Sequence, residues 1–256
     1  MQIDWNHTYA AIWRQRREAL RAVKNIDPIT LDDLLGIDTQ KTQLAANTQC
    51  FLDKLPANNA LLWGARGTGK SSLVKAVLNA NTRDGLRLIE VDKDDLIYLP
   101  EIVDEIRELP QRFIIFCDDL SFAENENTYK HLKSVLEGSV EQPPDNVLIY
   151  ATSNRRHLLP ETMKDNMDTK IVDGELHYSD AVEEKISLSD RFGLWLSFHP
   201  INMEKYLAIV DQLFTAYTGD REVLHESARS FARSRAAKSG RTARQFYNYY
   251  SSRKTD

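Results

Sequence analysis

Cysteine is scarce in this chain of 256 residues, which contains only Cys50 and Cys117. The two do not have a metal-ligand spacing, so the sequence predicts buried free thiols and a reducing compartment. Long apolar runs are also missing, because no stretch approaches the roughly 20 residues of a membrane span. The first residues, MQIDWNHTYAAIW, lack the basic start and continuous apolar stretch of a signal peptide. We therefore expect a cytoplasmic protein that does not contact a membrane.

An excess of basic residues is absent as well, since the formal net charge is −5. This balance argues against a protein that coats nucleic acid over its whole surface, although it allows a local basic face. The apolar content of 42% and the charged content of 28% are ordinary for a globular protein. At this length we expect one large domain, or a core with a small satellite domain.

The N-terminal segment has an amphipathic pattern. Over residues 4–24, apolar side chains are spaced for one face of a helix, namely Trp5, Tyr9, Ile12, Trp13, Leu20 and Val23. The other face is rich in arginine, with Arg14, Arg16, Arg17 and Arg21. Most such stripes pack on the protein's own core, so core packing is favoured over partner binding. Asp27-Pro28 breaks the pattern, and residues 1–28 are predicted to be an N-terminal helical segment.

From residue 29, strand and helix signals alternate. Apolar runs predict strands at 60–63, 86–91, 113–117 and 147–151, with helices at 71–78, 100–109 and 129–136. This alternation implies an α/β domain over residues 29–198, with a parallel sheet of the P-loop NTPase type and helices on both faces. The stretch 161–185 holds eight acids against three lysines and is predicted to be a solvated, disordered loop.

Strand signals stop after residue 198. Three helical patterns follow, at 203–217, 222–237 and 241–250, so residues 199–256 are predicted to form a small all-α lid domain. Between Arg229 and Lys254 this domain has eight basic residues and no acid, with Tyr247, Tyr249 and Tyr250 nearby. Basic and aromatic groups can bind nucleic acid, but a solvated helical face is the favoured interpretation.

A glycine-rich motif lies between the first predicted strand and its helix. Residues 64–71 match GxxxxGK[ST] at every defined position. Glycines let backbone N–H groups approach phosphates, and the following helix N-terminus adds free amides. Lys70 supplies a charge for the β- and γ-phosphates, and the Ser71 hydroxyl can ligate Mg²⁺. The residues predicted to bind nucleotide here are Gly64, Ala65, Arg66, Gly67, Thr68, Gly69, Lys70, Ser71 and Ser72.

Two carboxylates follow the apolar run at 113–117. Asp118 and Asp119 come at the carboxyl end of that predicted strand, where ligands bind in open α/β sheets. Asp118 is predicted to hold Mg²⁺ through water, and Asp119 is predicted to polarise an attacking water. The pair and the glycine-rich motif together predict a site for a nucleoside triphosphate with magnesium.

Several further stretches resemble the AAA+ ATPase superfamily. Residues 150–156 (YATSNRR) resemble its sensor 1 strand, 187–193 (SLSDRFG) its arginine-finger segment, and 239–241 (SGR) the start of its sensor 2 helix. Residues 31–38 (LDDLLGID) are similar to the stretch that lines its adenine pocket. The resemblance covers about residues 29–250. The runs FCDDLSF, YATSNRRHLLPE and SLSDRFGLWLSF resemble, more specifically, a bacterial AAA+ group known only as a domain of unknown function.

The resemblance implies a role for each matching residue. Leu35 and Ile37 would contact adenine, and Asn154 would hydrogen-bond the attacking water or the γ-phosphate. Arg191 would act as an arginine finger on the γ-phosphate of a neighbouring subunit, which implies a homo-oligomer. Arg241 would contact the nucleotide from the lid, with Arg244, one helical turn later, as the competing candidate. The implied cofactors are ATP and Mg²⁺.

One position departs from the superfamily pattern. Most hydrolysing members end the acidic strand in Asp-Glu, whereas this chain has Asp118-Asp119. Aspartate is one methylene shorter, so Glu124 or Glu126 is an alternative catalytic base. The favoured function is an oligomeric ATPase that remodels or loads an unknown protein or nucleic-acid partner. A nucleotide-dependent switch with little turnover and a P-loop small-molecule kinase are the alternatives.

Overall fold

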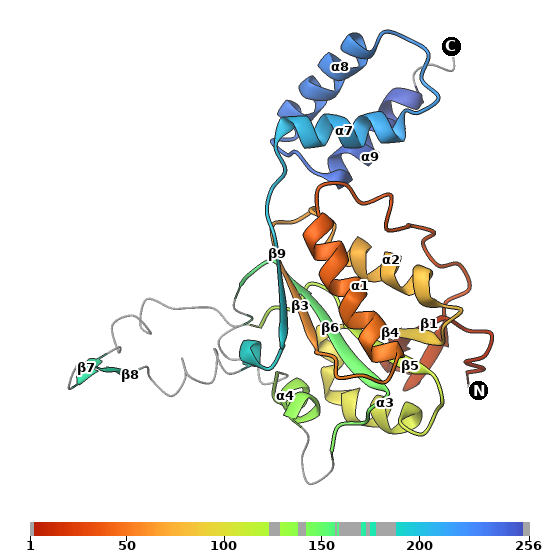
Figure 1. Ribbon diagram of the computed structural model, residues 1–256, viewed down its shortest axis with the longest axis vertical. Helices are drawn as coiled ribbons and strands as arrows, with labels where there is room; N and C mark the ends of the chain where they lie inside the picture. Colours follow the sequence, from red (N-terminus) through yellow and green to blue (C-terminus); the bar gives the residue numbers. More distant parts are fainter. Residues whose placement is uncertain are drawn as a thin grey trace.

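The computed structural model describes residues 3–122, 129–137, 142–156, 158, 170–172, 175–177 and 188–252. Its central element is a seven-stranded sheet in the order β2-β1-β4-β5-β6-β3-β9 (Figure 1). All neighbours in this sheet are parallel except the antiparallel pair of β1 and β2. The strands are β1 (Ala10–Arg14), β2 (Ala19–Ala22), β3 (Ala60–Gly64), β4 (Leu86–Glu90), β5 (Arg112–Cys117), β6 (Val147–Ser153) and β9 (Leu194–Phe198).

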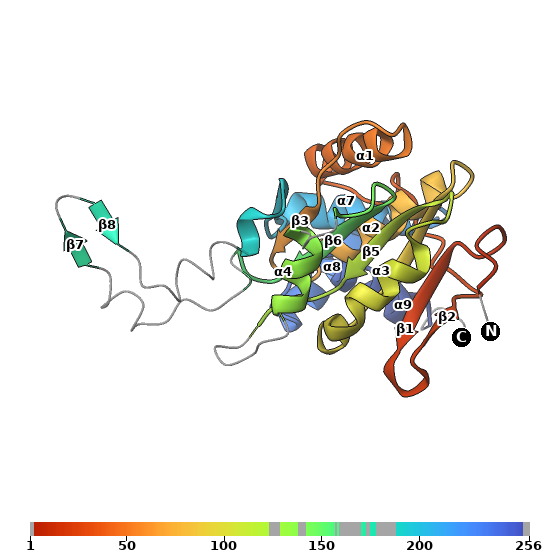
Figure 2. The ribbon, with the colours of Figure 1, turned by 90° about the horizontal axis from the view of Figure 1, so that it is seen from below.

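Helices cover both faces of the sheet (Figure 2). One apolar core forms where α3 (Leu99–Ile106) and α4 (Tyr129–Glu137) pack against the sheet, and it includes Phe113, Ile115 and Cys117 of β5. The other core forms under α1 (Asp38–Leu52) and α2 (Lys70–Asn81), and it includes Ile114 and Phe116 of the same strand. Side chains alternate along a strand, so a continuous apolar run fills both cores. The prediction of a parallel sheet between two helical layers is confirmed.

The two cysteines differ in exposure. Both are free thiols; Cys117 is fully buried, whereas Cys50 is only half-buried. Burial raises the pKa of the Cys117 thiol to about 12, and the nearby carboxylates of Asp118 and Asp92 add to this shift. A thiol held protonated in this way is unreactive near neutral pH.

The prediction of an N-terminal helix over residues 4–24 is wrong. The segment forms β1, a 3-10 turn (Gln15–Arg17) and β2, and β1 pairs in parallel with β4. Trp13 and Leu20, which fitted one helical face, are cross-strand partners in the β1–β2 register. Hydrogen bonds to β4 decide the conformation, because local spacing alone cannot distinguish a hairpin from a helix here. The core position predicted for the segment is correct for Trp13, which is buried.

All three helices predicted after residue 198 are present: α7 (Met203–Leu213), α8 (Arg221–Ser234) and α9 (Gly240–Ser251). They enclose a core of their own around Phe214 and Phe246. Asn202, Asp220 and Ser239 cap the three helix N-termini by accepting a bond from a backbone N–H group. This all-α unit is called the lid below. Among the described residues, no helix combines the length and apolarity that a membrane span needs.

The acidic stretch at 161–185 lies mostly outside the described residues. Within it, β7 (Lys170–Val172) and β8 (Glu175–His177) form an antiparallel pair. This pair is separate from the seven-stranded sheet.

Candidate nucleotide-binding site

The glycine-rich loop runs from the end of β3 to the start of α2, as the motif requires. Gly64 has a φ of +132°, and a Cβ atom built there would lie 2.0 Å from the carbonyl oxygen of Phe198 on β9. Gly67 has a φ of +76°, and its Cβ would lie 2.9 Å from the Ser239 hydroxyl of the lid. Only glycine tolerates these conformations and close approaches. The loop therefore packs between the sheet and the lid.

Lys70 is the first residue of α2, and its side chain is folded back over the loop. Its Nζ atom donates to the carbonyl oxygens of Gly64 (2.7 Å) and Ala65 (2.8 Å) and to Oδ1 of Asn154 (3.2 Å). Burial lowers the pKa of the Lys70 ammonium, while the carboxylates of Asp118 and Asp119 oppose that shift. An ammonium that is short of solvent and bonded mainly to neutral carbonyls is well placed to bind an anion.

Asp118, at the end of β5, is held by two hydroxyl groups. Its Oδ1 atom accepts from the Ser71 hydroxyl at 2.6 Å and from the Thr152 hydroxyl at 2.5 Å. Hydroxyl and carboxylate oxygens are hard ligands, and Mg²⁺ in nucleotide sites uses one or two such groups together with phosphate oxygens and water. The donor set formed by Ser71 and Asp118 therefore fits magnesium. Thr152 fixes the carboxylate from the neighbouring strand.

Asp119 is held beside Asn154 and the loop. Its Oδ1 atom accepts from Nδ2 of Asn154, its backbone N–H donates to the Thr152 hydroxyl (2.9 Å), and Nη2 of Arg66 lies 3.7 Å from its Oδ2. Asp119 has a φ of +53°, in the left-handed region. The turn after β5 thus directs two consecutive carboxylates to different partners. Asp118 accepts a hydrogen bond from the Ser71 hydroxyl, a group that can bind magnesium, and Asp119 accepts one from the amide of Asn154.

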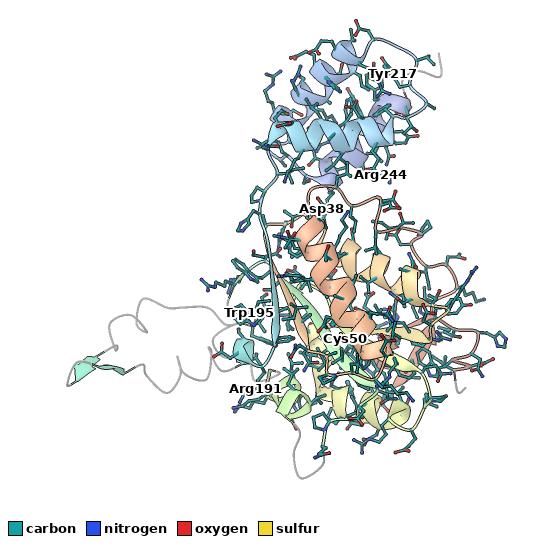
Figure 3. The ribbon with its side chains drawn as sticks, in the orientation of Figure 1. Asp38, Cys50, Arg191, Trp195, Tyr217 and Arg244 are labelled. Carbon is teal, nitrogen blue, oxygen red and sulfur yellow. The ribbon has the colours of Figure 1, made fainter. Side chains whose placement is uncertain are left out.

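These groups open into a cavity of about 890 Å³ between the sheet and the lid. The loop and the carboxylates form one wall; Leu34, Leu35 and Ile37 form an apolar part; Ile209, Leu213, Ser239, Arg241 and Arg244 contribute from the lid. Arg244 lies at the boundary between the lid and the sheet domain, above Asp38 (Figure 3). The volume is in the range of a drug-sized ligand pocket, and the lining combines polar and apolar groups.

The family comparison covers almost the whole chain. Residues 6–254 match the model of a family described as "Protein of unknown function (DUF815)". The chain belongs to this family. No curated protein matches the chain.

Two solved structures match the fold of this DUF815 chain. The ORC1 protein of Aeropyrum pernix, solved in complex with DNA, matches with a TM-score of 0.57 and 17% identity over 81% of this chain and 57% of that one. The RuvB Holliday junction branch migration motor of Thermotoga maritima matches with a TM-score of 0.48 and 13% identity, over 88% and 72% of the two chains. The DUF815 chain therefore shares the fold of this ORC1 structure, with a mostly parallel sheet between helices and a helical C-terminal part.

Most of the residues that the sequence predicted for the nucleotide site line this cavity. Its lining includes the loop residues 66–72 and, beyond the loop, Leu35, Ile37, Asp118, Asp119, Asn154 and Arg241. Gly64 and Ala65 face the site through the carbonyl oxygens that Lys70 binds. Glu124 and Glu126, the alternative bases, lie outside the described residues.

Arg191 does not reach the cavity of its own chain. It precedes β9, whereas the loop follows the carboxyl end of the parallel strand β3. Gly64 pairs with Phe198 at one end of β9, and Arg191 lies beyond Leu194 at the other. Five strand residues at about 3.3 Å each separate the two positions by roughly 17 Å. Figure 3 likewise shows Arg191 near α4, far from the lid boundary.

Sequence reasoning missed several cavity residues. Thr152 is fully buried within the predicted sensor 1 strand, and it holds Asp118. Ser239 caps α9 and touches the glycine-rich loop at Gly67. Both had a usable signal, since Thr152 is a polar residue inside an apolar strand and Ser239 stands at a helix N-cap position. Gln245 also lines the cavity, and no sequence pattern marks it, whereas Asp33, another lining residue, falls within the predicted stretch 31–38.

Proposed function

We propose that this DUF815 protein binds ATP with Mg²⁺ and hydrolyses it to ADP and phosphate, and that the nucleotide state drives remodelling or loading of a macromolecular partner. The observation that carries the proposal is a hydrogen-bonded cluster in the lining of the cavity: Lys70 bonds to Asn154, Asn154 to Asp119, and Ser71 to Asp118, and the Thr152 hydroxyl joins the two carboxylate residues. A phosphate-binding lysine, a magnesium-type ligand pair and a carboxylate with a polar partner are the parts that phosphoryl transfer needs.

The chemistry is proposed to follow from these contacts. When bound with the nucleotide, Mg²⁺ would neutralise charge on the phosphate oxygens, with Ser71 and Asp118 as its protein ligands. Lys70 would exchange the neutral carbonyls of the loop for phosphate oxygens, because a charge-assisted bond is stronger than a bond to a neutral acceptor. Asp119 would accept the proton of the attacking water, which Asn154 would orient.

The lid is proposed to read the nucleotide state. Leu35 and Ile37 would contact the adenine, since they are apolar residues in the lining of the cavity. Arg241 is the better candidate for the phosphate contact, because its charge acts on Lys70, whereas the charge of Arg244 acts on the Asp33 carboxylate. A γ-phosphate that meets a lid arginine in the ATP state and is lost in the ADP state gives the two states different contacts, and so shifts the lid equilibrium.

A nucleotide-dependent switch with little turnover remains the second candidate. It is favoured by Asp119, whose carboxylate is shorter than glutamate and is already engaged by Asn154 and Arg66. A base that is short and paired would activate water poorly. In that case ATP would still bind and close the lid, but hydrolysis would be slow.

Steady-state ATP hydrolysis separates the two candidates. The ATPase proposal predicts turnover by the wild-type protein and a loss of about 10²–10⁴-fold in Asp119→Asn, with ATP affinity retained. Asp84→Asn, which makes the same change in an exposed turn, serves as the control and should leave turnover unchanged. Wild-type protein that binds ATP–Mg²⁺ without turnover would support the switch instead. Equal turnover in wild type and Asp119→Asn would exclude Asp119 as the base.

A further inference from the structure

A cluster of arginines lies at the tip of the N-terminal hairpin, outside the nucleotide site. The hairpin turn and its flanks contain Arg14, Arg16, Arg17 and Arg21, and all four side chains are exposed. We call residues 14–21 the arginine turn; its only acid is Glu18, and it has no lysine. Arg21 lies on the edge strand β2, where a charge also blocks edge-to-edge pairing, but Arg16 and Arg17 lie in the turn itself.

The four arginines line a hollow of about 430 Å³. Its remaining walls come from the buried Trp13, from Gln15, and from Asp92 and Asp95, which follow β4. Because β1 and β4 are parallel, the hollow opens at the carboxyl edge of the sheet, the same edge as the glycine-rich loop. Four strand spacings of about 4.8 Å separate β1 from β3, so the hollow and the loop are roughly 19 Å apart along that edge.

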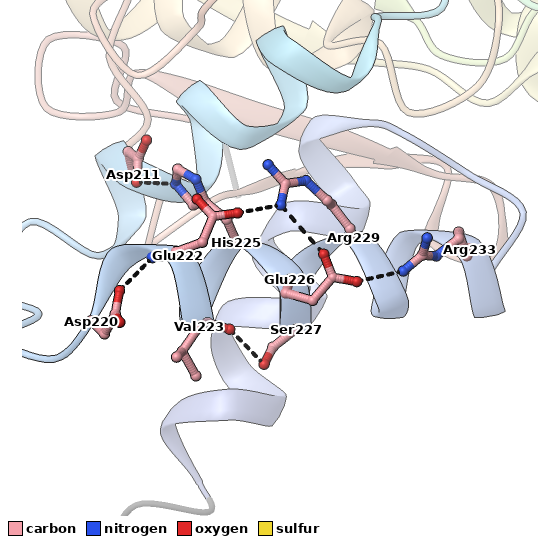
Figure 4. Close-up of polar contacts among 9 residues, drawn as sticks. All are labelled: Asp211, Asp220, Glu222, Val223, His225, Glu226, Ser227, Arg229 and Arg233. Atoms are coloured by element: carbon pink, nitrogen blue, oxygen red, sulfur yellow. Dashed lines mark hydrogen bonds and ion pairs between the residues drawn. The ribbon is translucent and has the colours of Figure 1, made fainter.

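None of the four arginines makes an ion pair or a side-chain hydrogen bond within the part of the chain that the structure describes. Several arginines of the lid are paired with acids: Arg229 binds Glu222 and Glu226, and Arg233 binds Glu226 (Figure 4). The basic residues of α8 are therefore paired with acids of α8 itself and with Asp211 of α7. The arginine turn is instead a concentration of unpaired guanidinium groups, which repel one another unless an anion is present.

The carboxylates on the opposite wall do not cancel the positive charge. Four arginines face two aspartates in the lining. Burial raises the pKa of the Asp95 carboxyl, Asp92 and Asp94 raise it further, and Arg14 opposes these shifts. The hollow therefore keeps a positive excess.

We propose that the arginine turn binds the phosphodiester backbone of a nucleic-acid strand. Guanidinium groups match phosphate oxygens through paired N–H donors, and a turn with arginine in place of lysine favours this planar recognition. An acidic protein partner is less well supported, because the residues that dominate protein interfaces include buried aromatic side chains as well as arginine. Among the described residues of the hairpin, 10–22, no large apolar side chain is exposed.

This proposal gives the proposed ATPase a nucleic-acid partner. It rests on the proposed ATPase function only for what strand binding would bring about, and not for the binding itself. Strand binding itself needs no nucleotide, because the hollow and the nucleotide cavity share no residue. A failure of nucleic-acid binding can therefore be distinguished from a failure of ATP binding. Binding is measured on the full chain without ATP, and ATP binding is measured separately.

The test is fluorescence anisotropy with labelled single-stranded and duplex DNA and single-stranded RNA of about 30 nucleotides, at salt concentrations from about 50 to 200 mM. Arg16→Ala/Arg17→Ala should weaken the binding of the best probe by about tenfold or more and lower the salt slope by one to two. Arg83→Ala/Lys130→Ala changes the net charge equally at exposed sites elsewhere and should bind as wild type. Circular dichroism spectra and melting temperatures like those of the wild type show that both variants are folded.

Three results would overturn the proposal. Wild-type protein that binds none of the nucleic-acid probes at low salt would refute it directly. Equal weakening in the hairpin and control variants would show that binding follows net charge and not this site. Binding of poly-glutamate that depends on Arg16 and Arg17, without binding of nucleic acid, would assign the turn to an acidic protein.

Discussion

At the residue scale, the side chains of the candidate site are held by bonds that a nucleotide would have to replace. Lys70 binds two loop carbonyls and the amide of Asn154, and Asp119 binds Asn154 and Arg66. Phosphate oxygens carry charge and compete well against neutral acceptors for an ammonium group. Rearrangement of Lys70 and Asn154 is therefore expected as the first response to ATP, before any motion of the lid.

Glu90, the last residue of β4, provides a pH-dependent test of the charge distribution along the sheet edge. Burial raises the pKa of its carboxyl, and the negative charge of Asp118 raises it further. The ionised form is thus less favourable in the folded than in the unfolded state, and this cost is present above the folded-state pKa and disappears below the unfolded value. We expect Glu90→Gln to raise the melting temperature at neutral pH.

The gain in Glu90→Gln should shrink as the pH falls through the folded-state pKa and vanish once both states are protonated. Thermal unfolding from acidic to neutral pH measures it, with the exposed Asp84→Asn as the matched control. A melting temperature that falls at neutral pH would contradict this account of Glu90.

At the element scale, the sequence predicted those parts whose determinants are local. The glycine-rich loop, the buried strands and the three lid helices each carry their signal within about 15 residues, in agreement with their observed bounds. The N-terminal hairpin was predicted wrongly, because β1 is fixed by pairing with β4, for example between Ile12 and Glu90. Such a partner is far away in the sequence, and residue spacing does not report it. Thr152 carries a local signal, because it is a polar residue inside an apolar strand, but its bond to Asp118 appears only once β6 lies beside β5.

The junction of β3, β9 and the loop yields a stability prediction. Gly64→Ala would place a Cβ atom 2.0 Å from the Phe198 carbonyl oxygen at a φ of +132°, so the loop has to move away from β9. We expect a loss of about 3 kcal/mol or more in the free energy of unfolding by urea. Gly240→Ala is the control, because a Cβ there meets nothing within 4 Å. It should be neutral or slightly stabilising, and equal losses in both variants would contradict the steric argument.

At the scale of the whole molecule, the nucleotide cavity and Arg191 lie at opposite ends of the sheet. The proposed function requires them to meet across the interface between two subunits. The nucleotide cavity lies at the carboxyl end of β3, and Arg191 lies beyond the amino end of β9. An arginine so placed is too far from the phosphates of its own chain. It would reach them only in a neighbouring copy, which makes assembly part of the proposed mechanism.

Mixing two inactive variants tests this arrangement. Lys70→Ala should lack nucleotide binding but keep its arginine, and Arg191→Ala should bind ATP normally but lose about 10³-fold in hydrolysis. A mixture of the two should recover part of the wild-type activity, because each supplies what the other lacks. Sizing by light scattering with and without ATP should show the assembly. Mixed oligomers without recovered turnover would contradict a role for Arg191 across the interface.

If the glycine-rich loop and Lys70 hold the phosphates of ATP, isothermal titration calorimetry with ATP and magnesium should show one binding event per wild-type chain. Lys70→Ala should then lose affinity by about 100-fold or more. Lys130→Ala, at an exposed lysine of α4, should bind as wild type. A wild-type chain that gives no binding signal, or a Lys70→Ala chain that binds as tightly, would contradict the account.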